Sequence, residues 1–430
     1  MSSNPSSSVQ KTVSSVFART PVTDIHTHLF DPAMGSLLLW GIDELLTYHY
    51  LVAEVLRARP ARNASHSVAG GPEMTYEAFW AMPKSAQADL IWQELFVKRT
   101  PVSEACRGVL TVLQALGLNV NTERLSDIRA YFAAQTVRGY VDQVFKLAGV
   151  ERVYMTNDPL NPVERLVWEK GFERDPRFLA ALRLDSALKD WPQSAGHLKA
   201  LGYAVDTSLS GQTLSEVRRY LNDWCQKIEA RYMAISLDPA FTYPDATASL
   251  TNLMVKAVMP VARERGIPVA LMIGVRKAVN PALGDAGDSV GLADIATVEH
   301  LARDFGDVTF LVTLLARENM HGLCVAARKF KNIVPFGCWW FLNNPSLIRE
   351  ITAMRLEMLG LSFIPQHSDC RILDQLVYKW THSRAVIGDV LASKYDDLVR
   401  AGRPVSEADI RRDLAALFDG RLINQRLSIS

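Results

Sequence analysis

The chain has 430 residues and is 48% hydrophobic, so it can bury a large core and is not disordered as a whole. Its 47 lysines and arginines nearly balance its 46 aspartates and glutamates, which excludes a global field favouring nucleic acid or an anionic membrane. Five scattered cysteines without a C-x-x-C pair argue against a disulfide framework and a zinc knuckle. Without an apolar run of 18 residues or the apolar core of a secretory signal, we expect a cytoplasmic protein.

The predicted elements begin after a polar, serine-rich segment, residues 1–16, which we expect to be a disordered arm. Short β-branched or apolar runs then recur, each followed by a stretch of helical period. Strands that alternate with helices imply a parallel sheet, and eight such units predict an α/β fold of the closed (β/α)₈ TIM-barrel type. The eight predicted strands are residues 22–26, 152–156, 178–184, 232–237, 268–273, 308–314, 333–337 and 361–365.

More than 120 residues separate the first two predicted strands, far too many for an ordinary βα loop. Residues 40–149 are rich in helical pattern and in aromatic side chains. We therefore expect a mostly helical insertion after the first strand, lying over the carboxyl-terminal mouth of a barrel built from residues 17–39 and 150–430. The glycine-rich, polar residues 61–73 predict an exposed loop within the insertion.

The strongest local signal for chemistry is the pair His26 and His28. Alternate residues of a strand share one face, so both imidazoles would project together from the end of the first strand. Two imidazoles there could bind one divalent metal ion, and catalytic groups gather at this end of a barrel. The alternative is a pair of ordinary strand-end histidines.

The segment around these histidines, TDIHTHL, is similar to the amidohydrolase superfamily. Further segments resemble uronate isomerases in the same order along most of the chain. The resemblance implies an isomerase that interconverts a hexuronate aldose and its ketose, of the glucuronate-to-fructuronate type, with a divalent metal near the site. The segments are Tyr48-His49-Tyr50-Leu51, Trp92-Gln93-Glu94-Leu95, Thr156-Asn157-Asp158-Pro159, Leu182-Arg183-Leu184-Asp185, Ile273-Gly274-Val275-Arg276, Gly337-Cys338-Trp339-Trp340-Phe341 and Ser368-Asp369-Cys370-Arg371.

The resemblance also assigns the catalytic roles. Asp369 becomes a metal ligand beside His26 and His28 and the carrier of the proton. His49 and Tyr50 would reach the hydroxyls and the carbonyl oxygen of the sugar. Isomerisation through an enediol needs such a base and a group that stabilises the developing oxyanion. The alternative for Asp369 is the N-cap of a helix beginning at Cys370.

Substrate binding is expected from four further side chains. A planar guanidinium binds a carboxylate in a bidentate way, and Arg183 and Arg371 each follow a predicted strand end. Both could instead form ion pairs with acidic neighbours. Trp339 and Trp340 could stack on the apolar face of a sugar or simply pack beneath the insertion. His367 could support the ligands from behind.

The chain also departs from the pattern that it resembles. Met272 stands where uronate isomerases usually carry a histidine on strand five, and Tyr48 replaces an aspartate. Imidazoles with one carboxylate suit Zn²⁺, and with only three protein ligands we expect that ion to bind weakly. A homo-oligomer that binds a small sugar acid, and neither nucleic acid nor membrane, is expected.

Two rival functions remain open. A metal-dependent hydrolase of amides or lactones would use the same fold. Such an enzyme needs further ligands on strands four to six, where Ser236, Met272 and Leu314 supply no imidazole. A sugar-acid-binding protein that has lost catalysis is the other alternative.

Overall fold

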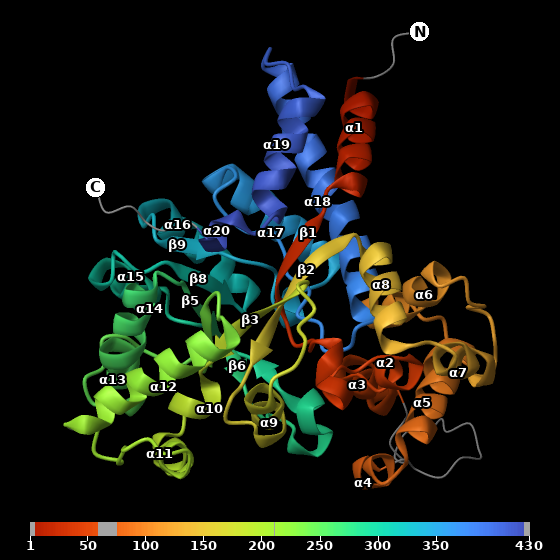
Figure 1. Cartoon of the computed structure of the whole chain (residues 1–430). Helices are drawn as coiled ribbons and strands as arrows, with labels where there is room; N and C mark the ends of the chain where they lie inside the picture. The colour runs from red at the N-terminus through yellow and green to blue at the C-terminus, as the bar shows by residue number, and fades with distance from the viewer. Residues whose placement is uncertain (1–4, 59–74, 210, 425–430) are drawn as a thin grey trace, which may run out of the picture.

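The computed structural model describes residues 5–58, 75–209 and 211–424. A curled, seven-stranded, wholly parallel sheet forms its centre (Figure 1). Six of the eight predicted strands overlap the observed strands within a few residues at each end. The seventh observed strand ends at Pro335, two residues before the predicted end at Gly337, whose φ of +64° is left-handed. In spatial order the strands are β1 (Val22–Thr27), β2 (Val150–Asn157), β3 (Phe178–Arg183), β4 (Met233–Leu237), β5 (Val269–Ile273), β8 (Phe310–Leu314) and β9 (Ile333–Pro335).

The eighth predicted strand, residues 361–365, is not a regular strand but does lie beside the sheet. Ile364 forms a parallel bridge with Phe336, and its carbonyl accepts a 2.9 Å hydrogen bond from the backbone of Gly337. On the other side, the backbone N–H of Asp369 donates to the carbonyl of His26 at 3.1 Å. Residues 364–370 therefore connect the two edge strands, β9 and β1.

Helices pack around the outside of this sheet (Figure 1). A short antiparallel hairpin, β6 (Val275–Arg276) with β7 (Ser289–Val290), follows β5. The helices that follow β2 are α9 (Pro162–Lys170), α10 (Asp185–Leu188), α11 (Trp191–Ala200), α12 (Gln212–Ile228), α13 (Ser249–Leu253), α14 (Met259–Arg265), α15 (Ile295–Asp304), α16 (Met320–Lys329), α17 (Pro345–Leu359), α18 (Gln375–Arg400), α19 (Glu407–Phe418) and α20 (Arg421–Asn424). Shorter 3₁₀ and π segments are η3 (Met254–Val258), η4 (Pro281–Gly287), η5 (Arg317–Asn319) and η6 (Trp340–Leu342).

The long segment between β1 and β2 is helical, as its pattern predicts. Buried side chains such as Phe79, Trp92 and Val144 belong to the same continuous core as the strands, and helices α6 and α8 pack against α18 (Figure 1). The predicted loop at residues 61–73 lies outside the described residues. The elements are η1 (Pro32–Leu37), α2 (Ile42–Leu46), α3 (His49–Ala58), α4 (Tyr76–Trp80), α5 (Lys84–Trp92), η2 (Gln93–Val97), α6 (Glu104–Ala115), α7 (Ser126–Ala133) and α8 (Val137–Ala148).

The prediction of a disordered arm at residues 1–16 is wrong for most of that segment. Helix α1 (Pro5–Arg19) lies along α18 and α19 (Figure 1). Its Val13, Val16 and Phe17 are buried at helical spacing, and the rings of Phe17 and Phe418 are 4.7 Å apart. The serine-rich composition hid this apolar stripe, whose burial stabilises the helix.

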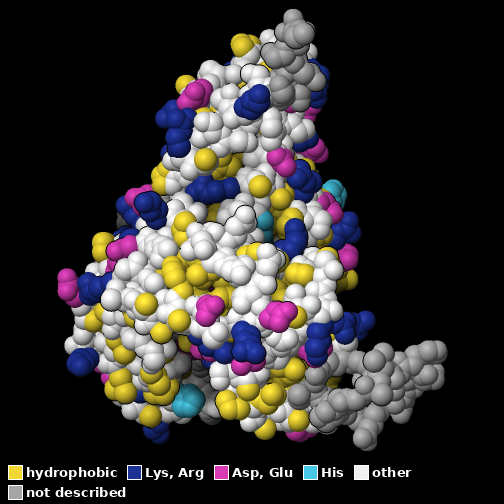
Figure 2. Space-filling model, turned by 90° about the vertical axis from the view of Figure 1, so that its right-hand side faces the viewer, with side chains coloured by type: hydrophobic (Ala, Val, Ile, Leu, Met, Phe, Trp, Pro, Cys, Tyr) yellow, Lys and Arg dark blue, Asp and Glu magenta, His cyan; other side chains and the backbone are white. Residues whose placement is uncertain are grey.

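The described surface matches the balanced composition. On the face in Figure 2, basic and acidic side chains are interspersed with hydrophobic and neutral ones, and neither sign forms a continuous patch. Within the described ranges, every helix is too short or too polar to span a lipid bilayer.

Candidate active site

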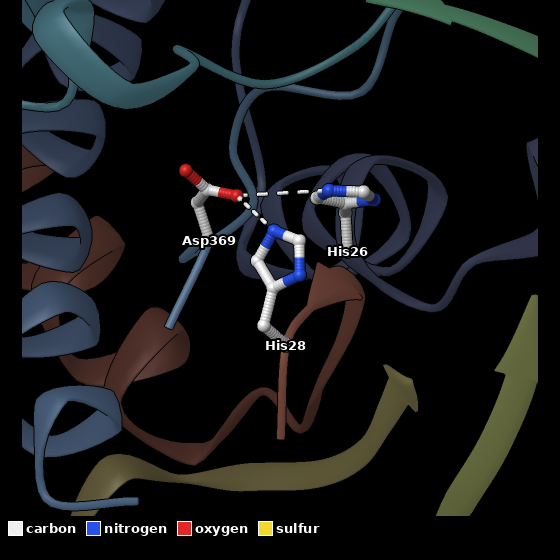
Figure 3. A group of neighbouring side chains, drawn as sticks. All are labelled: His26, His28 and Asp369. Atoms are coloured by element: carbon white, nitrogen blue, oxygen red, sulfur yellow. Dashed lines mark ion pairs between the residues drawn. The ribbon is translucent and has the colours of Figure 1, made fainter. Parts of the chain in front are cut away.

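Three side chains from two distant parts of the chain meet at the carboxyl-terminal end of the sheet. The Nε2 atoms of His26 and His28 lie 3.6 Å and 3.4 Å from Oδ1 of Asp369 (Figure 3). One ligand atom from each residue lies within 4.8 Å of the other two. The structure thus brings together the three residues that the sequence nominates for a metal, with their donor atoms facing one point.

Burial keeps both imidazoles uncharged. It lowers the pKa of His26 to about 3 and the pKa of His28 well below its usual value. Neither Nε2 of His26 nor Oδ1 of Asp369 accepts or donates a hydrogen bond among the described residues. These orphaned, buried atoms are free to coordinate a cation, and a neutral imidazole is the form that does so.

Asp369 occupies an unusual backbone position. Its φ of +55° lies in the left-handed region, and this conformation turns its carboxylate toward the two histidines. Helix α18 begins at Gln375, so the alternative role of Asp369 as the N-cap of a helix starting at Cys370 is wrong. Burial raises its pKa, and the nearby His26 and Arg371 oppose that rise.

A second buried carboxylate, Asp24, connects the segments that carry the site through hydrogen bonds. It accepts hydrogen bonds from the backbone of Ser368 at 3.1 Å and from the indole of Trp380 at 2.8 Å. It also accepts a longer bond from the backbone of His26 at 3.4 Å. Burial raises its pKa to about 6 despite these donors. Asp24 therefore ties β1 to the segment that carries Asp369 and to α18.

The two predicted guanidiniums line the same inner cavity, together with the histidines and Asp369. Arg183 contacts Asp185 at 3.3 Å, an ion pair between partly buried side chains. Among the described residues, the guanidinium of Arg371 has a single ion-pair partner, Asp285, which is 3.7 Å away and whose side chain is 86% exposed. An exposed, screened pair contributes little, so Arg371 is the guanidinium more readily available to a ligand.

His49, in the first turn of α3, lines the inner cavity, whereas Tyr50 packs on His49, 4.5 Å ring to ring, and is not among the residues that line the cavity. The ring of His49 lies 5.6 Å from that of Trp340, and burial lowers its pKa to about 3. Tyr50 is covered by the ammonium of Lys379, 5.7 Å from its ring centroid. Burial raises the pKa of Tyr50, so its hydroxyl stays protonated.

Trp339 and Trp340 follow β9 and line the inner cavity. Trp339 is 3% exposed and packs with the side chains inside the sheet. Trp340 has a left-handed φ of +45° and stacks on Phe341, 4.8 Å away. Trp339 therefore takes the packing role that the sequence left open, while both indoles contribute to the cavity wall.

One side of the inner cavity is apolar. Ala234 and Ile235 from β4, Met272 from β5 and Val275 from β6 form that wall. Met272 supplies the thioether where an imidazole would be expected from the resemblance. The candidate metal ligands therefore come from β1 and the segment after residue 364, while Thr156, Ser236 and Lys277 add polar groups elsewhere in the lining.

An outer cavity of about 630 Å³ adjoins the inner one. Tyr48, His49 and Arg371 line both cavities. The walls of the outer cavity come from the insertion, including the indole of Trp80, and from η4. The indole N–H of Trp80 joins these two walls by donating a 2.9 Å hydrogen bond to the carbonyl of Ala282. The insertion thus borders the approach to the site.

Sequence reasoning missed several groups around the site. The hydroxyl of Tyr232, directly before β4, lies 3.0 Å from Nδ1 of His26, 206 residues away along the chain. Lys277 lines the inner cavity and contacts Asp288 at 2.5 Å. Lys379, whose ammonium lies over the ring of Tyr50, pairs with Glu104 at 2.7 Å. No local motif marks these residues, because their roles arise from tertiary contacts.

His367 packs behind the ligands, as the sequence suggested. Its ring lies 5.2 Å from that of His26. Gly337, with φ +64°, leaves room for it, since a Cβ there would lie 1.9 Å from the imidazole. The buried guanidinium of Arg355 holds the carbonyl of Gly337 at 2.9 Å.

Comparison with solved structures identifies the family. The crystal structure of a uronate isomerase from Bacillus halodurans superposes with a TM-score of 0.93 at 50% sequence identity, covering 99% of this chain and 98% of that one. The chain belongs to the uronate isomerase family.

More distant members of this family share the fold. A uronate isomerase from Thermotoga maritima matches with a TM-score of 0.77 at 16% identity over 97% of both chains. A glucuronate isomerase from Caulobacter crescentus matches with a TM-score of 0.75 at 14% identity, over 100% of this chain and 96% of that one. No protein-family model and no curated protein sequence matches the chain.

Proposed function

We propose that this enzyme is an aldose–ketose isomerase that acts on a hexuronate, of the glucuronate-to-fructuronate type. The observation that carries the proposal is the meeting of His26, His28 and Asp369 beside Arg371 in a chain that is 50% identical, end to end, to a uronate isomerase. The site combines a buried base with a cation for the carboxylate of the sugar.

The proton transfer is assigned to Asp369. Its carboxylate takes the proton from C2 of the open-chain aldose, and the electrons of that C–H bond form the C1–C2 double bond of an enediol. A proton is delivered to O1, the proton on O2 is lost, and Asp369 returns its proton to C1 to give the ketose. His49, which is neutral and lines the cavity, is assigned the exchange of the protons on oxygen, and Tyr50, protonated and packed on the ring of His49 at 4.5 Å, supports it from behind.

Substrate orientation is assigned to the two guanidiniums. Arg371 binds the carboxylate, because its own partner, Asp285, is largely exposed and easily displaced. Arg183, already paired with Asp185, orients a hydroxyl of the sugar. Trp340 covers the apolar face of the bound sugar. The substrate enters through the outer cavity.

A divalent metal would be held by Nε2 of His26, Nε2 of His28 and a carboxylate oxygen of Asp369. The orphaned, buried donor atoms and the neutral state of both imidazoles fit such an ion. Imidazole and carboxylate ligands favour Zn²⁺. When bound, the ion would polarise the carbonyl oxygen of the sugar as a Lewis acid.

The sheet itself is inferred to close into a (β/α)₈ barrel, with residues 364–370 in the eighth position. Support comes from the hydrogen bonds of this segment to Gly337 on one side and to His26 and His28 on the other. A closed barrel places all the site residues on one rim. The helical insertion as a separate subdomain, the homo-oligomer and the cytoplasmic location stay predictions.

The proposal is tested by incubating the enzyme with a panel of aldohexuronates and ketohexuronates and following their proton NMR spectra. An isomerase interconverts at least one pair. A metal-dependent hydrolase interconverts none but opens lactones, and a binding protein without catalysis only broadens the signals. Either of the last two outcomes would overturn the proposal.

A further inference from the structure

The hydrogen bonds around Tyr232 determine which nitrogen of His26 carries its proton. The hydroxyl of Tyr232 lies 2.8 Å from the carbonyl of Ile25 and 3.0 Å from Nδ1 of His26. A tyrosine hydroxyl has one proton to donate, and a carbonyl oxygen can only accept. The proton of Tyr232 must therefore point to Ile25, since two oxygens at 2.8 Å without a proton between them repel each other. The hydroxyl then accepts from Nδ1 of His26, which carries the hydrogen.

The opposite nitrogen is consequently a bare acceptor. Nε2 of His26 has no hydrogen-bond partner among the described residues and faces Oδ1 of Asp369 at 3.6 Å. In the other tautomer, Nε2 would carry a proton directed at that carboxylate, and its lone pair would be occupied. The choice of tautomer therefore decides whether His26 presents a lone pair to the site.

We propose that Tyr232 is a positioning residue that fixes His26 as the Nδ1–H tautomer and so keeps the Nε2 lone pair available beside Asp369. The role of this arrangement in metal binding rests on the proposed function. The assignment of the tautomer rests on the hydrogen bonds of Tyr232 alone. Groups that orient a metal-binding imidazole in this way typically strengthen metal binding by about 10–100-fold.

Among the described residues, the hydroxyl of Tyr232 is the hydrogen-bond partner of Nδ1 of His26. Tyr232 is fully buried directly before β4, and burial raises the pKa of its hydroxyl, so the hydroxyl stays protonated. The neighbouring imidazole of His367 packs on His26 but makes no hydrogen bond to any described residue. Removing the Tyr232 hydroxyl would leave Nδ1–H as a buried donor without a partner, which is costly. The Nε2–H tautomer, able to donate toward Asp369, would then be favoured.

The experiment reads the tautomer directly in metal-free, full-length enzyme labelled with ¹⁵N-histidine. Long-range ¹H–¹⁵N correlation spectra distinguish the two tautomers, and His26→Gln assigns the signals among the nine histidines. Tyr232→Phe removes the acceptor. Tyr154→Phe is the matched control, because Tyr154 is buried 5.8 Å from Tyr232, ring to ring, and is not a hydrogen-bond partner of His26. Zn²⁺ affinity is measured for the same proteins by competition with a chelating dye.

The expected wild-type result is the Nδ1–H tautomer, which Tyr154→Phe retains. Tyr232→Phe is expected to shift His26 to the Nε2–H form and to raise the Kd for Zn²⁺ by at least ~10-fold. A wild-type Nε2–H tautomer would overturn the proposal without any variant having to fold. An unchanged tautomer or an unchanged Kd in Tyr232→Phe would overturn it as well. No substrate is involved, so these outcomes are separate from any failure of the isomerase assay.

Discussion

Replacing Asp369 with asparagine removes the proposed proton carrier, which is also the carboxylate ligand of the proposed metal site, while preserving the shape of the side chain. The side chains are isosteric, and asparagine is among the residues that best tolerate a left-handed backbone such as φ +55°. Oδ1 of Asp369 accepts no hydrogen bond from the described residues, so none is lost there. We therefore expect Asp369→Asn to leave the free energy of unfolding within about 0.5 kcal/mol of wild type.

The catalytic effect should be large. A positioned general base contributes about 10²–10⁴-fold to the rate, so kcat/KM for the preferred hexuronate should fall by that factor, about 3–5 kcal/mol of transition-state stabilisation. The assay is the rate of aldose–ketose conversion by NMR, with urea unfolding curves run on the same preparations. A variant that unfolds like wild type but retains kcat/KM within 10-fold would refute the assignment of the proton transfer to Asp369.

Three further predictions follow from the same geometry. Arg371→Lys keeps the charge but loses the planar fork, so kcat/KM should fall at least ~10-fold, or about 1.4 kcal/mol; unchanged steady-state kinetics would remove Arg371 from the site. Asp24 binds its proton more tightly in the folded state, so the free energy of unfolding should fall as pH rises from about 4 to about 6, by up to ~3 kcal/mol in all, of which roughly half falls above pH 5. Urea unfolding between pH 5 and 7.5 measures this slope. The Asp24→Asn variant should lose the slope, and an equal slope in that variant would contradict its assignment to Asp24. Mild chelation should remove the metal and abolish activity, and adding Zn²⁺ back should restore it. Elemental analysis of the double variant His26→Ala and His28→Ala should find no bound metal, whereas retained metal would place the metal site elsewhere.

Local periodicity accounts for what the sequence could predict. His26 and His28 are two residues apart on a strand, so their shared direction follows from strand geometry alone. The alternation of strands and helices likewise predicts a parallel sheet with its site at one end. The order of the segments, more than any one of them, indicated the family.

Tertiary contacts account for what the sequence could not predict. Tyr232 lies 206 residues from His26, and Asp24 bonds to Trp380 across 356 residues. Composition also misled at the N-terminus, because the serines of α1 hid the apolar stripe that includes Phe17. The segment at residues 361–365 reads as a strand, yet the edge pairing is made mainly by residues 364–370, which turn through the left-handed Asp369.

The most direct test of the central claim is the fate of the C2 hydrogen of the preferred aldohexuronate in deuterium oxide. Proton removal by Asp369 predicts that the wild-type enzyme forms the ketose and that Asp369→Asn, still folded, shows ~10²-fold slower loss of the C2 proton signal. Failure of the wild-type enzyme to exchange or isomerise any hexuronate would contradict the account.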